Sequence, residues 1–250
     1  MKLNFILLLG VIIGLVFLMF YGDSKELDDQ IMLKPWHMQR QEQNDSLSSY
    51  YLENYQIHGK GRLVEMLSST PQHKVIILVD AWGVPYIPQN LNEEFAVFSG
   101  LSAKKIIQRR LGNTTTHAEK AELRKKDSTG IFLFGGDSLE YNRKEYISQL
   151  GYDKLVLCQN CSDSVMLGKL DSILNENAII QTIAFTTQSS RDGDRLKLLK
   201  SLKLIRDLVA KHPESVFIIQ GTHRPVLTSG KIRESYYENW VPALIMGDAH

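Results

Sequence analysis

The sequence carries almost no net charge, because its 29 lysines and arginines are balanced by 28 aspartates and glutamates. This balance excludes bulk electrostatic attraction to anions, so we expect no nucleic-acid partner and require any anion site to be local. The composition is ordinary for a globular protein, with 43% hydrophobic and 23% charged residues. No internal repeat interrupts it.

Cysteine is scarce, with Cys158 and Cys161 as the only two, spaced C-x-x-C. Without a second pair, a four-cysteine zinc site is excluded. No thioredoxin-like pattern surrounds the pair, which disfavours a redox role. In an exported domain the same spacing favours a small structural disulfide, so the oxidation state depends on the compartment.

Polar side chains are nearly absent from residues 3–20, where Asn4 is the exception. A helix of that length rises about 27 Å, close to the thickness of a bilayer core. A cleaved signal peptide is the alternative. The apolar run is long for one, however, and residues 20–23 lack a clear small-x-small cleavage site. We therefore predict that residues 1–21 form a single transmembrane signal anchor.

The charges that flank this segment predict its orientation. Lys2 precedes it, whereas four acidic residues follow it: Asp23, Glu26, Asp28 and Asp29. The positive-inside rule then places the N-terminus in the cytoplasm and the remainder outside. We expect a single-pass protein of the cytoplasmic membrane with an extracytoplasmic C-terminal domain.

After the anchor, residues 22–70 are polar and predict a spacer with one short helix over 61–67, and residues 71–250 predict the folded domain. Apolar runs predict strands at 75–79, 130–136, 154–158, 178–186, 215–221 and 242–247. Periodic segments predict helices at 93–110, 142–150, 164–174 and 194–211. A further helix is predicted to begin after Gly112. This alternation predicts an α/β fold with a mostly parallel sheet flanked by helices on both faces.

Polar residues stand where these elements begin or end. Asp80 directly follows the first buried strand, Thr222 and His223 follow a later one, and three threonines, 114–116, begin a predicted helix. The carboxyl ends of parallel strands meet at one edge of a sheet, where α/β proteins bind ligands. Such a set can hold a divalent cation and activate a hydroxyl, and a helix N-terminus favours phosphate or sulfate. Each residue alone also fits a structural role as a cap, a turn former or a loop residue.

The order of these motifs resembles that of the alkaline phosphatase/sulfatase superfamily. The nearest branch is the membrane-anchored lipoteichoic-acid-synthase and phosphoglycerol- or phosphoethanolamine-transferase group. Five segments carry the resemblance: VILVDAWG, TTHAE (115–119), FLFGGDSLEYNRKEYISQLGYDKLV (132–156), QGTHRP and NWVPALIMG (239–247). Together they span about residues 73–250. The resemblance implies an αβα sandwich like that of alkaline phosphatase.

Residue by residue, the resemblance implies that Asp80, Thr115 and His223 bind a divalent metal ion, Mn²⁺ or Zn²⁺. Thr115 would also be the nucleophile. Thr114 and Thr116 remain alternatives for this role, because the motif can be aligned on either neighbour. The implied substrate is an anionic phosphate or sulfate ester of the cell envelope.

The same resemblance implies that Asn142 and Arg143 bind the anionic group of the substrate. A guanidinium fork matches the geometry of a phosphate or sulfate group. From the residues alone, Arg143 is as well explained as a solvated cation at a helix start.

Two departures divide the functional hypotheses. Thr222 stands where the family has an aspartate, and residues 185–194 lack the family's histidine, with Asp192 or Asp194 as candidate substitutes. The first hypothesis is a sulfatase-like, metal-dependent phospho- or sulfo-group transferase or hydrolase. The second is a catalytically inactive relative, a pseudoenzyme that serves as an envelope binding or assembly protein.

A protein partner is a further expectation from the aromatic tail, Tyr236, Tyr237 and Trp240. Aromatic residues are enriched at interfaces. Core packing explains the same residues equally well.

Overall fold

The computed structural model describes residues 46–67, 73–112, 114–124, 130–135, 149–158, 160–176, 182–188, 193–226 and 228–247. These residues belong to one compact unit, Asp45–His250. Within the described ranges, none of the helices has the length and apolarity needed to cross a bilayer. The predicted anchor, residues 1–21, lies outside them and stays a prediction.

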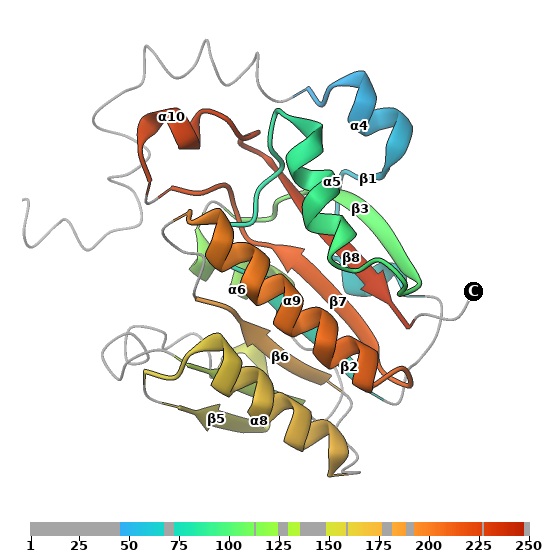
Figure 1. Cartoon of the computed structure of the whole chain (residues 1–250). Coiled ribbons are helices and arrows are strands. Elements are labelled where there is room, and N and C mark those ends of the chain that lie inside the picture. Colours follow the sequence, from blue (N-terminus) through green and yellow to red (C-terminus); the bar gives the residue numbers. More distant parts are fainter. Residues whose placement is uncertain are drawn as a thin grey trace, which may run out of the picture. The chain divides into compact units, whose positions relative to one another are not determined.

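An eight-stranded sheet forms the centre of this unit, in the order β1-β3-β8-β7-β2-β6-β4-β5 (Figure 1). All neighbouring strands are parallel except β8, which runs antiparallel to both β3 and β7. The strands are β1 (Gln56–His58), β2 (Lys74–Val79), β3 (Ala103–Arg109), β4 (Gly130–Phe134), β5 (Lys154–Leu157), β6 (Thr182–Thr186), β7 (Val216–Gly221) and β8 (Trp240–Met246). The predicted α/β class with a mostly parallel sheet is confirmed.

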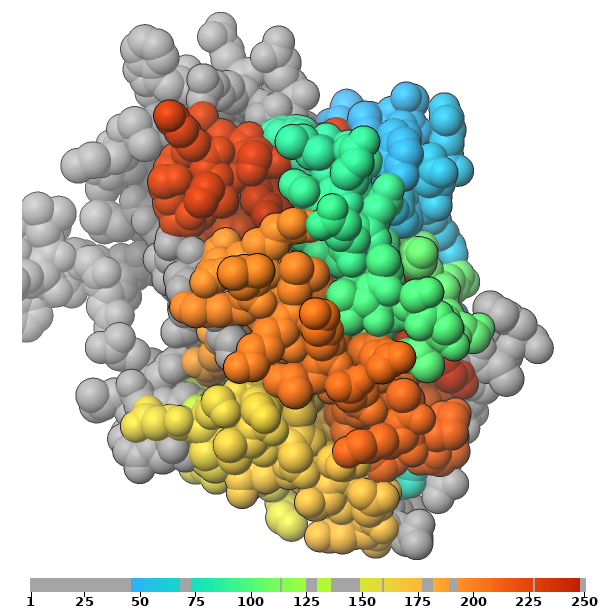
Figure 2. Space-filling view, viewed as in Figure 1, coloured from blue at the N-terminus to red at the C-terminus, as the bar shows by residue number. Residues whose placement is uncertain are grey.

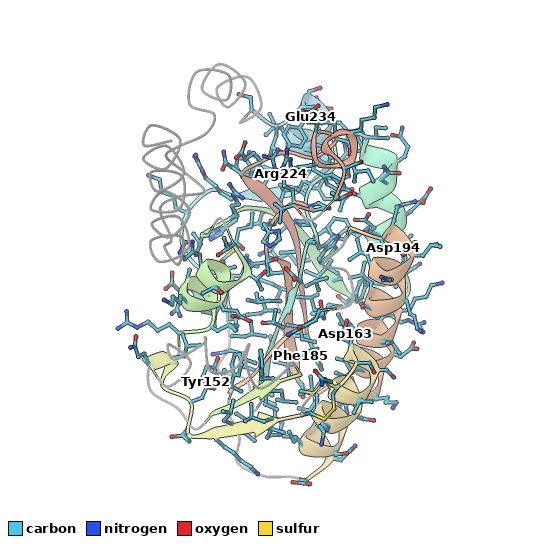
Figure 3. The ribbon with its side chains drawn as sticks, turned by 90° about the vertical axis from the view of Figure 1, so that its left-hand side faces the viewer. Tyr152, Asp163, Phe185, Asp194, Arg224 and Glu234 are labelled. Atoms are coloured by element: carbon cyan, nitrogen blue, oxygen red, sulfur yellow. A yellow bond between two sulfur atoms is a disulfide. The ribbon has the colours of Figure 1, made fainter. Side chains whose placement is uncertain are left out.

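Helices cover both faces of the sheet. The longer ones, α5 (Pro88–Ala96), α8 (Asp163–Asn175) and α9 (Arg195–Lys211), lie on one face, and α6 (Thr115–Glu122) lies on the other (Figures 1 and 3). Figure 2 shows the side chains of α5, α8 and α9 covering their face. The remaining described helices are short: α4 (Ser49–Asn54), η1 (Leu63–Met66) and α10 (Gly230–Arg233).

Burial of β2 on both faces explains its unbroken apolar run. Val75, Ile77 and Val79 pack into the core under α8 and α9. Ile76 and Leu78 pack into the second core on the α6 side. A central parallel strand needs apolar residues at every position because it has no solvent face.

Helices α8 and α9 begin and end close to where the sequence predicts. Asp194 caps α9 by accepting hydrogen bonds from the backbone N–H of Leu196 and Lys197, and Ser162 caps α8 by accepting from Val165 N. Capping side chains satisfy the N–H groups that the first turn leaves unpaired. The predicted helix at 142–150 and the start of the predicted strand at 178–186 fall largely outside the described residues.

The helix predicted over residues 93–110 is wrong in its second half. Helix α5 ends at Ala96, and residues Ala103–Arg109 form β3 between β1 and β8. Leu91, Phe95 and Phe98 keep a helical spacing, which hides the change of structure that follows. Gly100, at φ +87°, makes the turn into the strand.

Residues 46–67 belong to the folded unit, although they lie within the range predicted as a spacer. Strand β1 pairs with β3, and Tyr51 and Leu63 are fully buried. Tyr51 also donates its hydroxyl to the carbonyl of Pro85, at 2.5 Å. Each of these short elements buries only one or two large side chains, so no periodic pattern marks them in the sequence.

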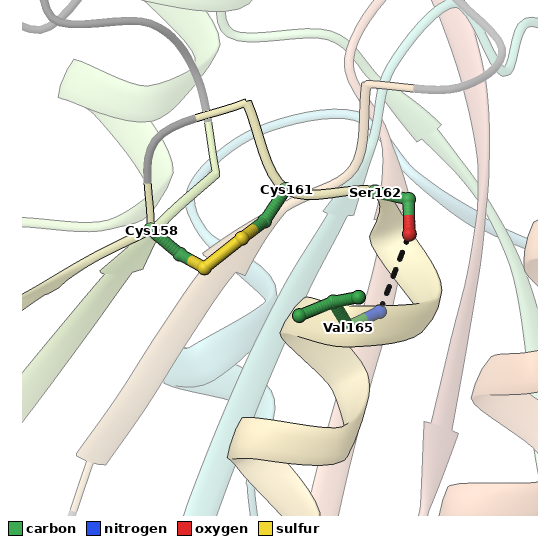
Figure 4. Close-up of a disulfide and its surroundings, with 4 residues drawn as sticks. All are labelled: Cys158, Cys161, Ser162 and Val165. Carbon is green, nitrogen blue, oxygen red and sulfur yellow. Dashed lines mark hydrogen bonds between the residues drawn. A yellow bond between two sulfur atoms is a disulfide. The ribbon is translucent and has the colours of Figure 1, made fainter.

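Cys158 and Cys161 form a disulfide, with their Cα atoms 5.5 Å apart (Figure 4). The bond joins the end of β5 to the residue before Ser162, the N-cap of α8. The structural disulfide favoured for an exported domain is therefore present.

We predict that replacing both cysteines by serine lowers the free energy of unfolding by about 2 kcal/mol. A bond that closes so short a loop removes about that much conformational free energy from the unfolded chain. Urea unfolding of the oxidised protein and of the double variant measures the difference. Equal unfolding midpoints would contradict the prediction. Reductant, added as a control, should shift only the unsubstituted protein.

Candidate active site

Three side chains from distant parts of the sequence meet above the carboxyl edge of the sheet. The Thr115 hydroxyl donates a hydrogen bond to Asp80 Oδ1, at 2.7 Å. His223 Nε2 lies 3.1 Å from Thr115 Oγ1 and 3.3 Å from Asp80 Oδ1. Asp80 and His223 are buried, whereas Thr115 is partly exposed. The hydroxyl is thus the member of the group that a ligand can reach.

Sheet topology brings Asp80 and His223 together. β2 and β7 are parallel neighbours with Val79 opposite Gly221, so both chains leave the sheet at the same edge. The pairing continues one residue further, where Thr222 N donates to Val79 O at 3.1 Å. Asp80 and Thr222 are therefore held side by side at adjacent strand ends.

Close approach of two backbones fixes this arrangement. A Cβ atom on Gly221 would lie 1.8 Å from the carbonyl oxygen of Trp82, and one on Gly83 would lie 2.7 Å from Arg224 Cα. Ala81, directly after Asp80, adopts a left-handed conformation, at φ 56°. That conformation is unfavourable for alanine, and residues held in it cluster at functional sites. Both glycines are needed for the two loops to cross.

Thr115 is the first residue of α6, and Thr114 is its N-cap. Thr114 Oγ1 accepts a hydrogen bond from His117 N, at 3.2 Å. Of the two, only Thr115 is hydrogen bonded to Asp80 in the described contacts. The positive end of a helix dipole and its unpaired N–H groups lie beside the Thr115 hydroxyl, where they favour a bound anion.

Thr222 and Thr187 also contact Asp80. Thr222 donates its hydroxyl to Asp80 Oδ1 at 3.1 Å and accepts from Ala81 N at 3.3 Å. Thr187 Oγ1 accepts from Asp80 N at 3.1 Å. Sequence reasoning did not select Thr187. Its position directly after a predicted strand, next to β2, is the signal that could have found it.

The backbone around His223 determines which ring nitrogen carries the proton. Nδ1 lies 2.6 Å from the carbonyl oxygen of Arg224, which can only accept, so Nδ1 is protonated. In the neutral ring, Nε2 then presents a lone pair toward Asp80 Oδ1. Two acceptors at 3.3 Å are stable together when a proton or a cation lies between them.

The donor atoms Asp80 Oδ1, Thr115 Oγ1 and His223 Nε2 fit a divalent cation. With separations of 2.7, 3.1 and 3.3 Å, a point about 2 Å from all three exists, as Zn–N and Zn–O bonds require. Carboxylate oxygen and imidazole nitrogen are ligands that Zn²⁺ and Mn²⁺ accept. In the described part of the chain, no group of three His, Cys, Asp or Glu side chains is placed to hold a metal ion. The present set consists of one carboxylate, one imidazole and one hydroxyl.

Of the other residues singled out in the sequence, three cannot be placed and two have structural contacts. Asn142 and Arg143 lie outside the described residues, as does Asp192. Asp194 is the N-cap of α9, a structural role. Tyr237 is buried, and its ring packs against those of Tyr51 and Tyr86, so core packing accounts for it.

Two buried glutamates flank the site. Burial raises the pKa of Glu94 to about 7, although Glu94 Oε2 accepts a hydrogen bond from Trp82 Nε1 at 2.8 Å. Burial likewise raises the pKa of Glu122, in α6, to about 7. A carboxylate with a raised pKa stabilises the fold most at low pH, and this contribution is lost as the pH rises from about 4.5 to about 7.

Comparison with solved structures identifies the fold. The lipoteichoic acid synthase LtaP from Listeria monocytogenes matches with a TM-score of 0.52 and 12% identity, over 72% of this chain and 66% of that one. The C-terminal periplasmic domain of EcEptC from Escherichia coli matches with a TM-score of 0.50 and 10% identity, over 72% and 73% of the two chains. The match thus spans slightly less than two thirds of the LtaP chain. No protein-family sequence model matches the chain, and no curated protein sequence does.

The chain therefore has the fold that is seen in this lipoteichoic acid synthase and in this periplasmic EptC domain. The resemblance seen in the sequence motifs is therefore confirmed in three dimensions. At 10–12% identity, the likeness concerns the fold, and function has to be argued from the site.

We predict that Gly221→Ala lowers the free energy of unfolding by at least about 3 kcal/mol, because the new methyl group meets a backbone carbonyl that cannot move aside. Gly168→Ala is the matched control: it lies in α8, where an added Cβ has nothing within 4 Å. That change should stabilise the protein by about 0.5–1 kcal/mol. Equilibrium unfolding of both variants measures the effects, and a neutral Gly221→Ala would contradict the crossing-loop account.

Proposed function

We propose that this chain is a membrane-anchored, metal-dependent phospho-group transferase or hydrolase that acts on phosphate esters of the cell envelope. The observation that carries the proposal is the Thr115 hydroxyl, partly exposed at a helix N-terminus and in contact with both Asp80 and His223. Its fold, shared with a lipoteichoic acid synthase and a periplasmic EptC domain, supports the same class of reaction. Sulfate esters remain the alternative substrate class.

Thr115 is proposed as the nucleophile. Its Oγ1 forms a bond to phosphorus while the bond from phosphorus to the ester oxygen breaks. The hydroxyl proton passes to water and the leaving oxygen takes a proton from water, so the first step has no net proton change. In a second step water or an acceptor alcohol attacks the phosphothreonine and the bond from phosphorus to Thr115 Oγ1 breaks. The proton that the attacking oxygen loses then restores the Thr115 hydroxyl.

Asp80, Thr115 and His223 are the residues that would hold the divalent cation, Mn²⁺ or Zn²⁺. Such an ion, when bound, neutralises phosphate charge and lowers the pKa of a neighbouring hydroxyl. The chain's own contribution is position, since the Asp80 and His223 side chains are buried and fixed by β2 and β7. Thr222 keeps Asp80 oriented by its hydrogen bond but adds no charge.

Substrate binding is proposed for Asn142 and Arg143, whose side chains suit the anionic group of the ester. Residues 1–21 are proposed as the anchor, which would hold the folded unit outside the cytoplasmic membrane. An envelope substrate then lies in the same compartment as the site.

The second candidate is a catalytically inactive relative that binds or assembles envelope material. The observation in its favour is Thr222, which leaves Asp80 as the only carboxylate among the four side chains that meet at the site. A hard cation binds more weakly when a carboxylate ligand is replaced by a neutral hydroxyl.

Trapping the covalent intermediate tests the enzyme proposal. The full chain is incubated with Mn²⁺ or Zn²⁺ and with p-nitrophenyl phosphate, bis-p-nitrophenyl phosphate or p-nitrophenyl sulfate, then quenched in acid and mapped by tandem mass spectrometry. We expect an adduct on Thr115. Thr115→Ala should lose the adduct and lower turnover by about a thousandfold or more. Thr116→Ala, one residue along the same helical turn, should keep both. Undiminished turnover of Thr115→Ala would remove Thr115 as the nucleophile.

Metal titration separates the two candidates. We expect the wild type to bind about one Mn²⁺ with a rise in melting temperature, because a ligand that binds only the folded state stabilises it. Asp80→Ala should lose this rise. Thr222→Asp should tighten Mn²⁺ binding about tenfold or more through an added carboxylate, whereas Thr222→Asn, of similar size and without charge, should not. Binding by Thr222→Asp alone would favour the inactive relative.

A further inference from the structure

Helix α6 carries the proposed nucleophile, yet it has almost no apolar face. Its sequence is TTHAEKAE, and the residues it buries are Ala118, Glu119 and Glu122. Helices that cover a sheet normally do so with a stripe of large apolar side chains, as α9 does with Leu198, Leu202 and Ile205. Apart from the C-cap residue Leu123, which is buried in the core on this side of the sheet, polar contacts are therefore needed to fix the position of α6.

Glu122 supplies such contacts at the C-terminal end of the helix. Its Oε1 accepts a hydrogen bond from Gln220 Nε2 at 2.7 Å and another from Gln108 Nε2 at 3.0 Å. The three side chains are at most 4% exposed. Buried carboxyl and amide groups need hydrogen-bond partners, and the loss of these bonds leaves polar atoms unsatisfied.

The two glutamines come from strands on either side of β8. Gln108 lies in β3 and Gln220 in β7, and Ala243 of β8, which is buried, pairs with Gln220 between them. The small alanine leaves room for a carboxylate to reach both strands. Gln108 also donates to the carbonyl oxygen of Gly61, at 3.2 Å, so the cluster extends to the segment before η1.

The Gln220 contact joins the two halves of the site. Gln220 is followed by Gly221, Thr222 and His223 on β7, while Glu122 lies on the same two-turn helix as Thr115. Residues 122 and 220 are 98 positions apart in sequence, and their bond sets the position of α6 against the strand that carries His223. A shift of α6 would move the Thr115 hydroxyl away from Asp80 and His223.

We propose that Glu122 is a positioning residue for the nucleophile: through its bond to Gln220 it holds α6 so that the Thr115 hydroxyl meets Asp80 and His223. The inference rests on the proposed role of Thr115. It concerns the position of residue 115, which can be measured without turnover, so the two proposals can fail separately.

The chain offers a direct probe of that position. Its only two cysteines form the Cys158–Cys161 disulfide, so Thr115→Cys introduces the single free thiol. In this background, the rate of alkylation by iodoacetamide is measured at a pH above the pKa of the thiol, so that it reports access to the thiol and not its thiolate fraction.

We expect Glu122→Ala to raise the alkylation rate about tenfold, because the loss of two buried hydrogen bonds makes local opening of α6 easier. Glu122→Gln keeps an acceptor oxygen and should restore the rate to within about twofold. Asp163→Ala is the matched control. Asp163 is also a buried carboxylate that accepts two hydrogen bonds, from Gln188 N and Ser201 Oγ, but on the α8–α9 side of the sheet (Figure 3). Asp163→Ala should lower the melting temperature without changing the alkylation rate.

Equal rates for Glu122→Ala and Asp163→Ala would overturn the proposal. If Glu122→Ala does not fold, two milder variants decide it. Gln220→Met removes the donor on β7 and should raise the rate, whereas Gln108→Met removes the donor on β3, which carries no site residue, and should raise it less. Equal effects of these two substitutions would also overturn the proposal.

Discussion

The crossing of two loops directly above the sheet is the constraint on which the site depends. The carbonyl of Trp82, after β2, occupies the space where any other residue at position 221 would place its Cβ. Because the two loops are this close, Thr222 can donate to Asp80 while accepting from Ala81 N. The left-handed backbone at Ala81 is a local cost of this crossing, which the pairing of β2 with β7 offsets.

The two halves of the candidate site are held by different kinds of force. Asp80, Thr222 and His223 extend from central strands whose position is fixed by apolar packing on both faces. Thr115 extends from a short helix whose buried face is largely acidic. Buried polar contacts are directional, so they define one position of the helix more narrowly than apolar packing does. A narrowly defined position favours a nucleophile, because small displacements of a reacting atom lower the rate of the reaction.

The sequence predicted those parts of the structure that have a strong local pattern. The central strands and α8 and α9 were predicted because their apolar residues repeat over many positions. Asp80, His223 and the threonines 114–116 were candidates because they stand at the ends of elements, and Thr115 was chosen among the three by the family resemblance. Strand β3 was missed because Leu91, Phe95 and Phe98 continue a helical spacing into the turn before it. Glu122 was not selected because its role comes from a partner 98 residues away, which no local pattern encodes. Thr187, whose partner is 107 residues away, was missed although it directly follows a predicted strand.

The strand order has a consequence for how the chain folds. β2 is made early but pairs with β6 and β7, and its end contacts residues 107 and 142 positions later. Contacts of such long range make folding slow. Until β6 and then β7 have emerged, β2 lacks its neighbouring strands. Its run VIILV, after Lys74, is uncharged and strongly β-forming, which is the composition that promotes aggregation. A chain exported during synthesis would therefore need its apolar central strand shielded until the C-terminal third arrives.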